Sequence, residues 1–139
     1  MNYEISVFYC FPRSGGTLIN QCLLCAPENV VLSEVNPTRS VIEPEVQAAE
    51  WFGLLTQEAA AQLRGRTYIE RIEEIARQSR AQKRRLCLRD WVGVNFLPDT
   101  SEWSPTPSSV LEQKRYLEHA GFRLREARVL RRSAALYSS

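Results

Sequence analysis

The 139-residue sequence contains no hydrophobic run near the ~20 residues that a membrane-spanning helix needs. Its N-terminus has no basic segment ahead of the first apolar stretch, and Pro12 and Arg13 interrupt that stretch, which is untypical of a signal peptide. The four cysteines lie in apolar segments and do not suggest a small disulfide-bonded scaffold. We therefore expect a cytoplasmic protein without a membrane span.

Metal ligands are also scarce. Cys22 and Cys25 are three residues apart, but the sequence has no second pair of this kind, and a structural zinc ion needs four ligands. We expect both cysteines to pack in the core and expect no bound metal. The single histidine, His119, falls near the end of an expected helix, where an interaction with the helix dipole is favoured over catalysis.

The charge is low and unevenly distributed. A net charge of +2 is too small to indicate a nucleic-acid partner, and none is expected. Sixteen of the eighteen basic residues are arginine, whose planar guanidinium suits phosphate and sulfate oxygens. One basic run, Arg80 with residues 83–85, has the charge to contact an acidic partner, although a solvated helix end is the favoured interpretation.

The first third of the chain has the pattern of a strand, a helix and a second strand. Residues 5–11 are rich in β-branched and aromatic side chains and are stopped by Pro12, which predicts a buried strand. A short helix is expected over residues 18–25 and a second strand over residues 30–32. Because a helical crossover joins parallel strands, we expect these two strands to be parallel.

The same alternation continues along the chain. The spacing of apolar and turn residues predicts, in order, helices over 44–63 and 68–82, a strand over 86–88, a loop over 97–109, a helix reaching His119 and a strand over 127–130. This order predicts an α/β fold with a mainly parallel sheet, as a single domain over residues 1–139. Because Ser139 falls only a few residues into the next expected helix, we expect the domain to be incomplete at its C-terminus.

The loop over residues 12–17 joins the first strand to the first helix. Its backbone N–H groups would lie at the positive end of the helix dipole, and the two glycines allow a close approach, which together predict an anion site. Arg13 would add positive charge, and Ser14 and Thr17 would donate hydroxyl hydrogen bonds. The loop is not a Walker A motif, because it lacks the lysine and the leading glycine. Nor is it a Cys-x5-Arg loop, since Gly16 stands where that arginine would be.

Polar residues follow each expected strand. They are Arg13 and Ser14, Ser33 and Glu34, Arg89 and Asp90, and Arg131 and Arg132. The carboxyl ends of parallel strands share one edge of the sheet, so these groups are expected to converge. Glu34 would lie beside the anion loop if its strand neighbours the first. A carboxylate in that place suits a general base, and a salt bridge to Arg13 or Arg39 is the alternative.

The segment 12–18 resembles the 5′-phosphosulfate-binding loop of sulfotransferases that use 3′-phosphoadenylyl sulfate. That loop usually reads Pro-Lys/Arg-Ser-Gly-Thr-Thr, and here Gly16 replaces the first threonine. Glu34 follows Arg13 by twenty-one residues, the interval typical of tyrosylprotein sulfotransferases. Arg131 followed by Ser139 resembles the pair that binds the 3′-phosphate. The resemblance covers the N-terminal half of the family only, and the segment 40–120 carries no matching motif.

The resemblance implies a P-loop-like, three-layer fold. It also implies transfer of a sulfuryl group from 3′-phosphoadenylyl sulfate to a hydroxyl or amine of a small-molecule or peptide acceptor, with no metal. The implied catalytic residues are Arg13 and Glu34. The implied co-substrate-binding residues are Arg13, Ser14, Gly15, Gly16, Thr17, Leu18, Arg131 and Ser139. A non-catalytic nucleotide- or anion-binding fragment or a degenerate paralogue is the alternative, and a P-loop kinase is disfavoured by the missing lysine. The sequence leaves the acceptor and the oligomeric state open.

Overall fold

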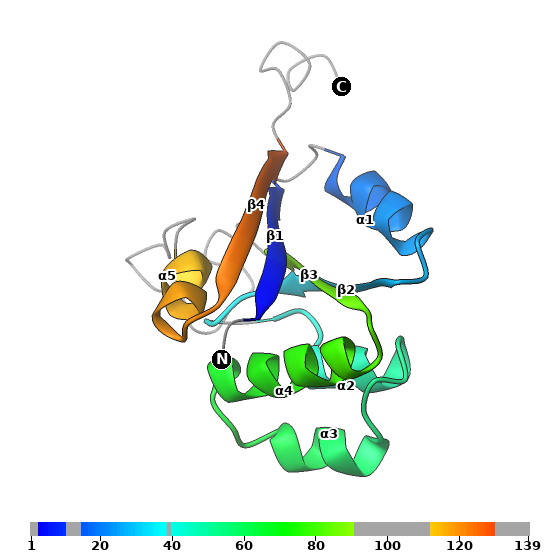
Figure 1. The fold of residues 1–139 in the computed structure, drawn as a ribbon, viewed down its shortest axis with the longest axis vertical. Coiled ribbons are helices and arrows are strands. Elements are labelled where there is room, and N and C mark those ends of the chain that lie inside the picture. Colours follow the sequence, from blue (N-terminus) through cyan, green and yellow to red (C-terminus); the bar gives the residue numbers. More distant parts are fainter. Residues whose placement is uncertain (1–2, 11–14, 39, 91–111, 130–139) are drawn as a thin grey trace.

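The structure, a computed structural model, describes residues 3–10, 15–38, 40–90 and 112–129 (Figure 1). Within these residues the strands form one four-stranded sheet in the order β2-β3-β1-β4, and every pairing is parallel. The strands are β1 (Glu4–Cys10), β2 (Asn29–Val35), β3 (Arg85–Asp90) and β4 (Arg123–Val129). The helices are α1 (Gly16–Leu24), α2 (Pro44–Glu50), α3 (Gln57–Leu63), α4 (Tyr68–Ala81) and α5 (Glu112–His119). The expected α/β fold with a parallel sheet is confirmed for this part of the chain.

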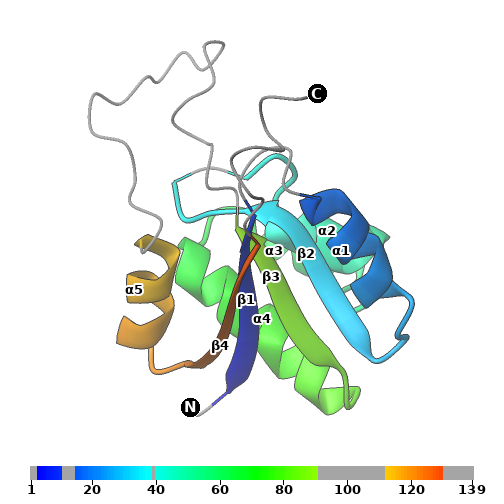
Figure 2. The same cartoon turned by 90° about the horizontal axis from the view of Figure 1, so that it is seen from above.

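Helices cover both faces of the sheet. Side chains alternate along a strand, so Ile5 and Tyr9 of β1 point into the larger core beneath α2, α4 and α5, while Phe8 points to the opposite face. There Phe8 packs in a smaller cluster with Ile19 and Leu23 of α1. Figure 2 shows α1 in front of the sheet and α4 behind it. The larger core therefore lies on one face of the sheet. Of the described helices, α1 alone covers the other face.

The predicted helix over 44–63 is wrong, because two short helices occupy this stretch. Gly53 adopts φ +59°, a left-handed conformation that favours glycine, and the chain turns there. Leu54 then donates its N–H back to the carbonyl of Ala48 and buries its side chain in the core. Thr56 begins α3 by accepting a hydrogen bond from the N–H of Ala59.

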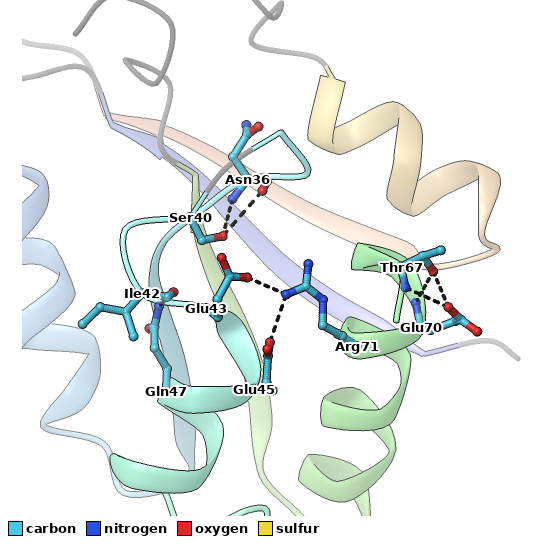
Figure 3. A network of polar contacts seen from close by, with 9 residues as sticks. All are labelled: Asn36, Ser40, Ile42, Glu43, Glu45, Gln47, Thr67, Glu70 and Arg71. Atoms are coloured by element: carbon cyan, nitrogen blue, oxygen red, sulfur yellow. Dashed lines mark hydrogen bonds and ion pairs between the residues drawn. The ribbon is translucent and has the colours of Figure 1, made fainter. Parts of the chain in front are cut away.

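The predicted helix over 68–82 is confirmed as α4. Thr67 and Glu70 form a reciprocal capping box at its start, which satisfies two of the free N–H groups of the first turn (Figure 3). Ile72 and Ile75 are fully buried in the larger core. No helix in the described ranges is long and apolar enough to cross a lipid bilayer.

Three strands are longer than predicted, and β3 runs over Arg85–Asp90 instead of residues 86–88. The last strand begins at Arg123, four residues before the expected start, and its charged side chains obscure the strand pattern. Charged side chains are frequent on edge strands, where they discourage pairing with other chains, and β4 lies at an edge of the described sheet. The second strand continues past the predicted residues 30–32 to Val35, with an irregular register between Leu32 and Val35.

Candidate functional site

The main chain at the start of α1 supplies the N–H groups of the expected anion site. Gly15 precedes the helix at φ +90°, a conformation that favours glycine, and it supplies no side chain to cap the helix. The first N–H groups of α1 are thus not capped by a side chain at this position, and they lie at the positive end of the helix dipole. Thr17 is exposed in this first turn, and Leu18 is 64% exposed. These features suit an anion approaching from solvent.

Four predicted site residues lie outside the described residues. They are Arg13, Ser14, Arg131 and Ser139. The described part of the candidate site therefore consists of the α1 start and the ends of β2 and β3.

Gly16 occupies a position without room for a side chain. A Cβ atom placed there would lie 2.6 Å from the Cβ and 2.8 Å from the Sγ of Cys10, at the end of β1. It would also lie 3.3 Å from Nη2 of Arg89. Close packing of the α1 start on β1 thus accounts for a glycine at this position. Burial raises the pKa of the Cys10 thiol, and Arg89 partly opposes that rise.

Arg89, near the end of β3, spans the distance from α1 to β2. It pairs in register with Phe8 of β1 and so projects to the same face of the sheet as Cys10. Its Nη2 lies 3.5 Å from Oε1 of Glu34, and its Nη1 donates to Oγ of Ser33 at 3.3 Å. The Arg89 side chain is only 14% exposed, and its Nε is buried with no hydrogen-bond partner among the described residues. Arg89 therefore joins the two halves of the candidate site.

Glu34 lies at the carboxyl edge, but not in the way expected from the sequence. The expectation that its strand neighbours β1 is wrong, because β3 lies between β1 and β2. Its ion-pair partner in the described residues is Arg89, whereas Arg13 and Arg39 lie outside them. The Glu34 side chain is 36% exposed, so its carboxylate remains accessible from solvent.

The Glu34 backbone is held in an unusual conformation. Its φ is +53°, which costs a non-glycine residue of the order of 1–3 kcal/mol and often marks a functional site. Gln47 of α2 supports the preceding residue: its Oε1 accepts from the N–H of Ser33 at 2.7 Å, and its Nε2 donates to the Ser33 carbonyl at 2.8 Å. The Glu34 carbonyl accepts from the N–H of Val41 at 3.2 Å. These bonds fix the bulged end of β2.

A buried polar cluster supports the same edge from the opposite face of the sheet. Asp90 is 3% exposed and accepts from Nδ2 of Asn36 at 2.9 Å. With its amide oriented to satisfy both ends, Gln113 of α5 donates to Asp90 at 3.3 Å and to the Val35 carbonyl at 2.8 Å. The carboxylate thus ties the end of β3 to the chain that follows Glu34.

A second polar cluster lies between α2 and α4 (Figure 3). Arg71 of α4 pairs with Glu43 and Glu45, at 3.1 Å in the case of Glu45. The Glu45 side chain is fully buried. Burial lowers the pKa of Arg71, but its hydrogen bond to Glu43 and the Glu45 charge bring the pKa above its ordinary value. This cluster fixes α2, and with it Gln47, against α4.

The cysteine pair lies in a different environment from the one predicted. Cys22 and Cys25 are both exposed, so the expectation of core packing is wrong for them, because α1 turns Ile19 and Leu23 toward the sheet instead. Cys10 and Cys87, by contrast, are buried. Within the described ranges, no three or more His, Cys, Asp or Glu side chains are grouped as metal ligands.

Sequence reasoning placed Arg89 at a strand end but gave it no role, and it did not identify Gln47.

Comparisons of the chain with protein-family models, with curated proteins and with solved structures found no match. The resemblance to sulfotransferases therefore rests on the residues of the chain itself.

Proposed function

We propose that this chain is a sulfotransferase domain. It would bind 3′-phosphoadenylyl sulfate at the carboxyl edge of the sheet and transfer the sulfuryl group to a hydroxyl or amine of a small-molecule or peptide acceptor. One observation carries the proposal: Arg89 contacts Glu34 and lies beside Gly16 at the start of α1. The candidate base and the anion cradle thus share one edge, bridged by a single side chain.

The fold supports the proposal in a general way. A strand, a glycine-containing loop and a helix lead into a parallel sheet with helices on both faces, and anionic ligands bind at the carboxyl edge of such sheets. We include in the proposal that this is a P-loop-like, three-layer fold. The order β2-β3-β1-β4 places β1 inside the sheet, between β3 and β4.

The proposed reaction is an in-line displacement at sulfur. A bond forms between the acceptor oxygen or nitrogen and sulfur, while the bond from sulfur to the phosphate oxygen breaks and leaves its electron pair on 3′-phosphoadenosine 5′-phosphate. Glu34 accepts the proton that the acceptor loses. Backbone N–H groups of α1 and the cations near them stabilise the charge on the peripheral oxygens.

Each residue has a role in this scheme. Arg13 and Ser14 with Gly15, Gly16, Thr17 and Leu18 hold the 5′-phosphosulfate, and Arg131 and Ser139 hold the 3′-phosphate. An anion bound at the α1 start attracts the Arg89 guanidinium as well, and so weakens its pairing with Glu34. The scheme assigns no step to a metal ion.

A second function is favoured by one observation. The Glu34 carboxylate is already ion-paired with Arg89, which is also the arrangement expected if Glu34 only stabilises the edge of the sheet. The chain would then be a non-catalytic module that binds a nucleotide or another anion. A P-loop kinase is disfavoured, because residues 12–18 contain no lysine.

Thermal-shift titration separates these functions. We expect 3′-phosphoadenosine 5′-phosphate to raise the melting temperature, and ATP with magnesium to have little effect. Arg89→Gln should reduce the shift, whereas Arg64→Gln, an exposed arginine at the end of α3, should leave it unchanged. A larger shift with ATP and magnesium would overturn the proposal in favour of a kinase.

A transfer assay then tests the base. Glu34→Gln should retain the shift with 3′-phosphoadenosine 5′-phosphate and lose sulfotransfer to a panel of phenols and amines. Retained transfer in this variant would show that Glu34 is not the base. Nucleotide binding without transfer in the unmodified chain would favour the non-catalytic module.

A further inference from the structure

A groove of about 880 Å³ lies at the amino edge of the sheet, where the strands begin. The first residues of three strands line it: Glu4 of β1, Asn29 of β2 and Arg85 of β3. From there it extends along β1 as far as Phe8, whereas the candidate site lies at the carboxyl ends of the strands. A groove of this size is large enough for a small ligand or a short peptide segment.

Four arginines line the groove, and three of them, Arg80, Arg84 and Arg85, are not paired with a carboxylate of the described residues. Arg80, near the end of α4, lies with its guanidinium carbon 5.4 Å from the centre of the Tyr3 ring. Arg84 donates to the carbonyls of Phe52 at 3.1 Å and Asn29 at 3.4 Å. Arg85 is exposed at the first position of β3. None of the three forms a salt bridge with a carboxylate in the described part of the chain.

The carboxylates of the groove are already paired. Oε1 of Glu4 forms an ion pair with Nε of Arg125 at 2.7 Å, and Glu126 accepts from Nζ of Lys114 at 2.6 Å. Neither is committed to Arg80, Arg84 or Arg85, so the positive charge of these three is uncompensated by the groove itself. A cationic groove with this balance attracts an anionic partner.

The remaining lining distinguishes between kinds of anion. Apolar side chains of β1 and α1 contribute to it, including Phe8, Ile19 and Leu23. A nucleic-acid backbone carries a phosphate at every nucleotide, so its phosphates would be repelled by the carboxylates of Glu4 and Glu126. A polypeptide can place acidic side chains at the arginines and apolar ones over the apolar wall, and can avoid the two carboxylates.

We propose that this groove docks an acidic, partly apolar polypeptide segment of a partner protein, through Arg80, Arg84 and Arg85. The partner is thereby held at the edge of the sheet opposite the proposed sulfotransferase site. This docking does not depend on that proposed activity.

Fluorescence anisotropy of the full chain tests the proposal. The probe is a labelled decapeptide in which glutamate alternates with alanine and leucine, and the control peptide carries glutamine in place of glutamate. We expect Arg80→Glu/Arg85→Glu to weaken binding about tenfold or more at low salt, and the glutamine peptide to bind as weakly. The matched control is Arg64→Glu/Arg115→Glu, which changes the net charge equally at exposed arginines elsewhere and should bind like the unmodified chain.

Three outcomes would overturn the proposal. Equal loss in the two double variants would show attraction to net charge alone. Tighter binding of a ten-nucleotide oligothymidine than of the peptide would assign the groove to nucleic acid. The third outcome concerns the NMR amide chemical shifts of the unmodified chain. If the peptide changes these shifts only at residues away from Tyr3 and Arg85, the contact lies elsewhere. Glu34→Gln should leave peptide binding unchanged, so docking and sulfotransfer can fail separately.

Discussion

The guanidinium of Arg89 on β3 pairs with the carboxylate of Glu34 on β2, with Nη2 and Oε1 3.5 Å apart. The two residues come from neighbouring parallel strands, and fifty-five positions separate them in the sequence. Because the pair lies beside Gly16, we expect a substitution of Arg89 or Glu34 to affect the start of α1.

The left-handed backbone conformation of Glu34 should lower the stability of the fold, and a glycine at this position should remove that strain. Glu34→Ala and Glu34→Gly both lose the ion pair with Arg89, but only glycine adopts φ +53° without strain. We expect the Gly variant to have a free energy of unfolding about 1 kcal/mol higher than the Ala variant. Urea denaturation measures both, and equal stability of the two variants would contradict the strain at this position.

Gly16 should not tolerate a methyl group. In Gly16→Ala the new Cβ would meet Cys10 at 2.6 Å, so β1 or α1 must shift. We expect a loss of about 1–3 kcal/mol in the free energy of unfolding, together with weaker binding of 3′-phosphoadenosine 5′-phosphate. The control is Gly65→Ala, where no atom lies within 4 Å of the added methyl group. A Gly16→Ala variant as stable as this control would contradict the close packing.

Arg71 should be needed to compensate a buried charge. Arg71→Met leaves the fully buried Glu45 carboxylate without this partner, and we expect the free energy of unfolding to fall by about 3–5 kcal/mol. The double variant Arg71→Met/Glu45→Leu should recover part of that loss, because no charge then remains to be buried. As a control, Arg66→Met removes an exposed pair with Glu70 and should change stability little. A similar loss in Arg66→Met would point to lost packing of the arginine stems instead.

Tyr9 should weaken the fold at alkaline pH. Burial raises the pKa of Tyr9 well above its ordinary value, and the charges of Glu126 and Asp90 raise it further. The phenol thus stays protonated in the folded chain while the unfolded chain ionises near pH ~10, so stability falls as the pH rises through that range. Tyr9→Phe should reduce this fall between pH 8 and pH 11, measured as melting temperature.

At neutral pH Tyr9→Phe should be neutral or slightly stabilising. The Tyr9 hydroxyl is buried without a hydrogen-bond partner among the described residues, so its removal leaves no group unpaired. Tyr116→Phe, at a ring that is 49% exposed, serves as the control and should keep the full alkaline loss. An unchanged pH profile in Tyr9→Phe would show that other groups cause that loss.

The parallel α/β sheet was predictable because apolar runs of strand length end at Pro12 and at polar residues. Three features of the fold were not. The helix pattern over 44–63 contains a turn that depends on how Leu54 reaches the core, and β4 is concealed by charges that suit an edge strand. The order of the strands was equally hidden, since nothing local indicates that β3 inserts between β1 and β2.

The candidate site follows the same division. The loop and Glu34 could be placed at one edge, because strand ends converge in any parallel sheet. The role of Arg89 could not be predicted, since it depends on which strands are neighbours. Gln47 acts on Ser33 from fourteen residues away, and only the packing of α2 against β2 brings the two together.

The parallel direction of the four described strands places the groove arginines Arg80, Arg84 and Arg85 toward the amino edge of the sheet and the candidate site at its carboxyl edge. A strand of seven residues such as β1 spans ~20 Å, about twice the distance over which 0.1 M salt screens a charge. Adding or removing a charge at one edge should therefore change the electrostatic potential at the other edge very little. The proposed docking at one edge could therefore be altered by substitution without altering the proposed chemistry at the other, so the two properties would be free to vary independently in evolution and in engineering.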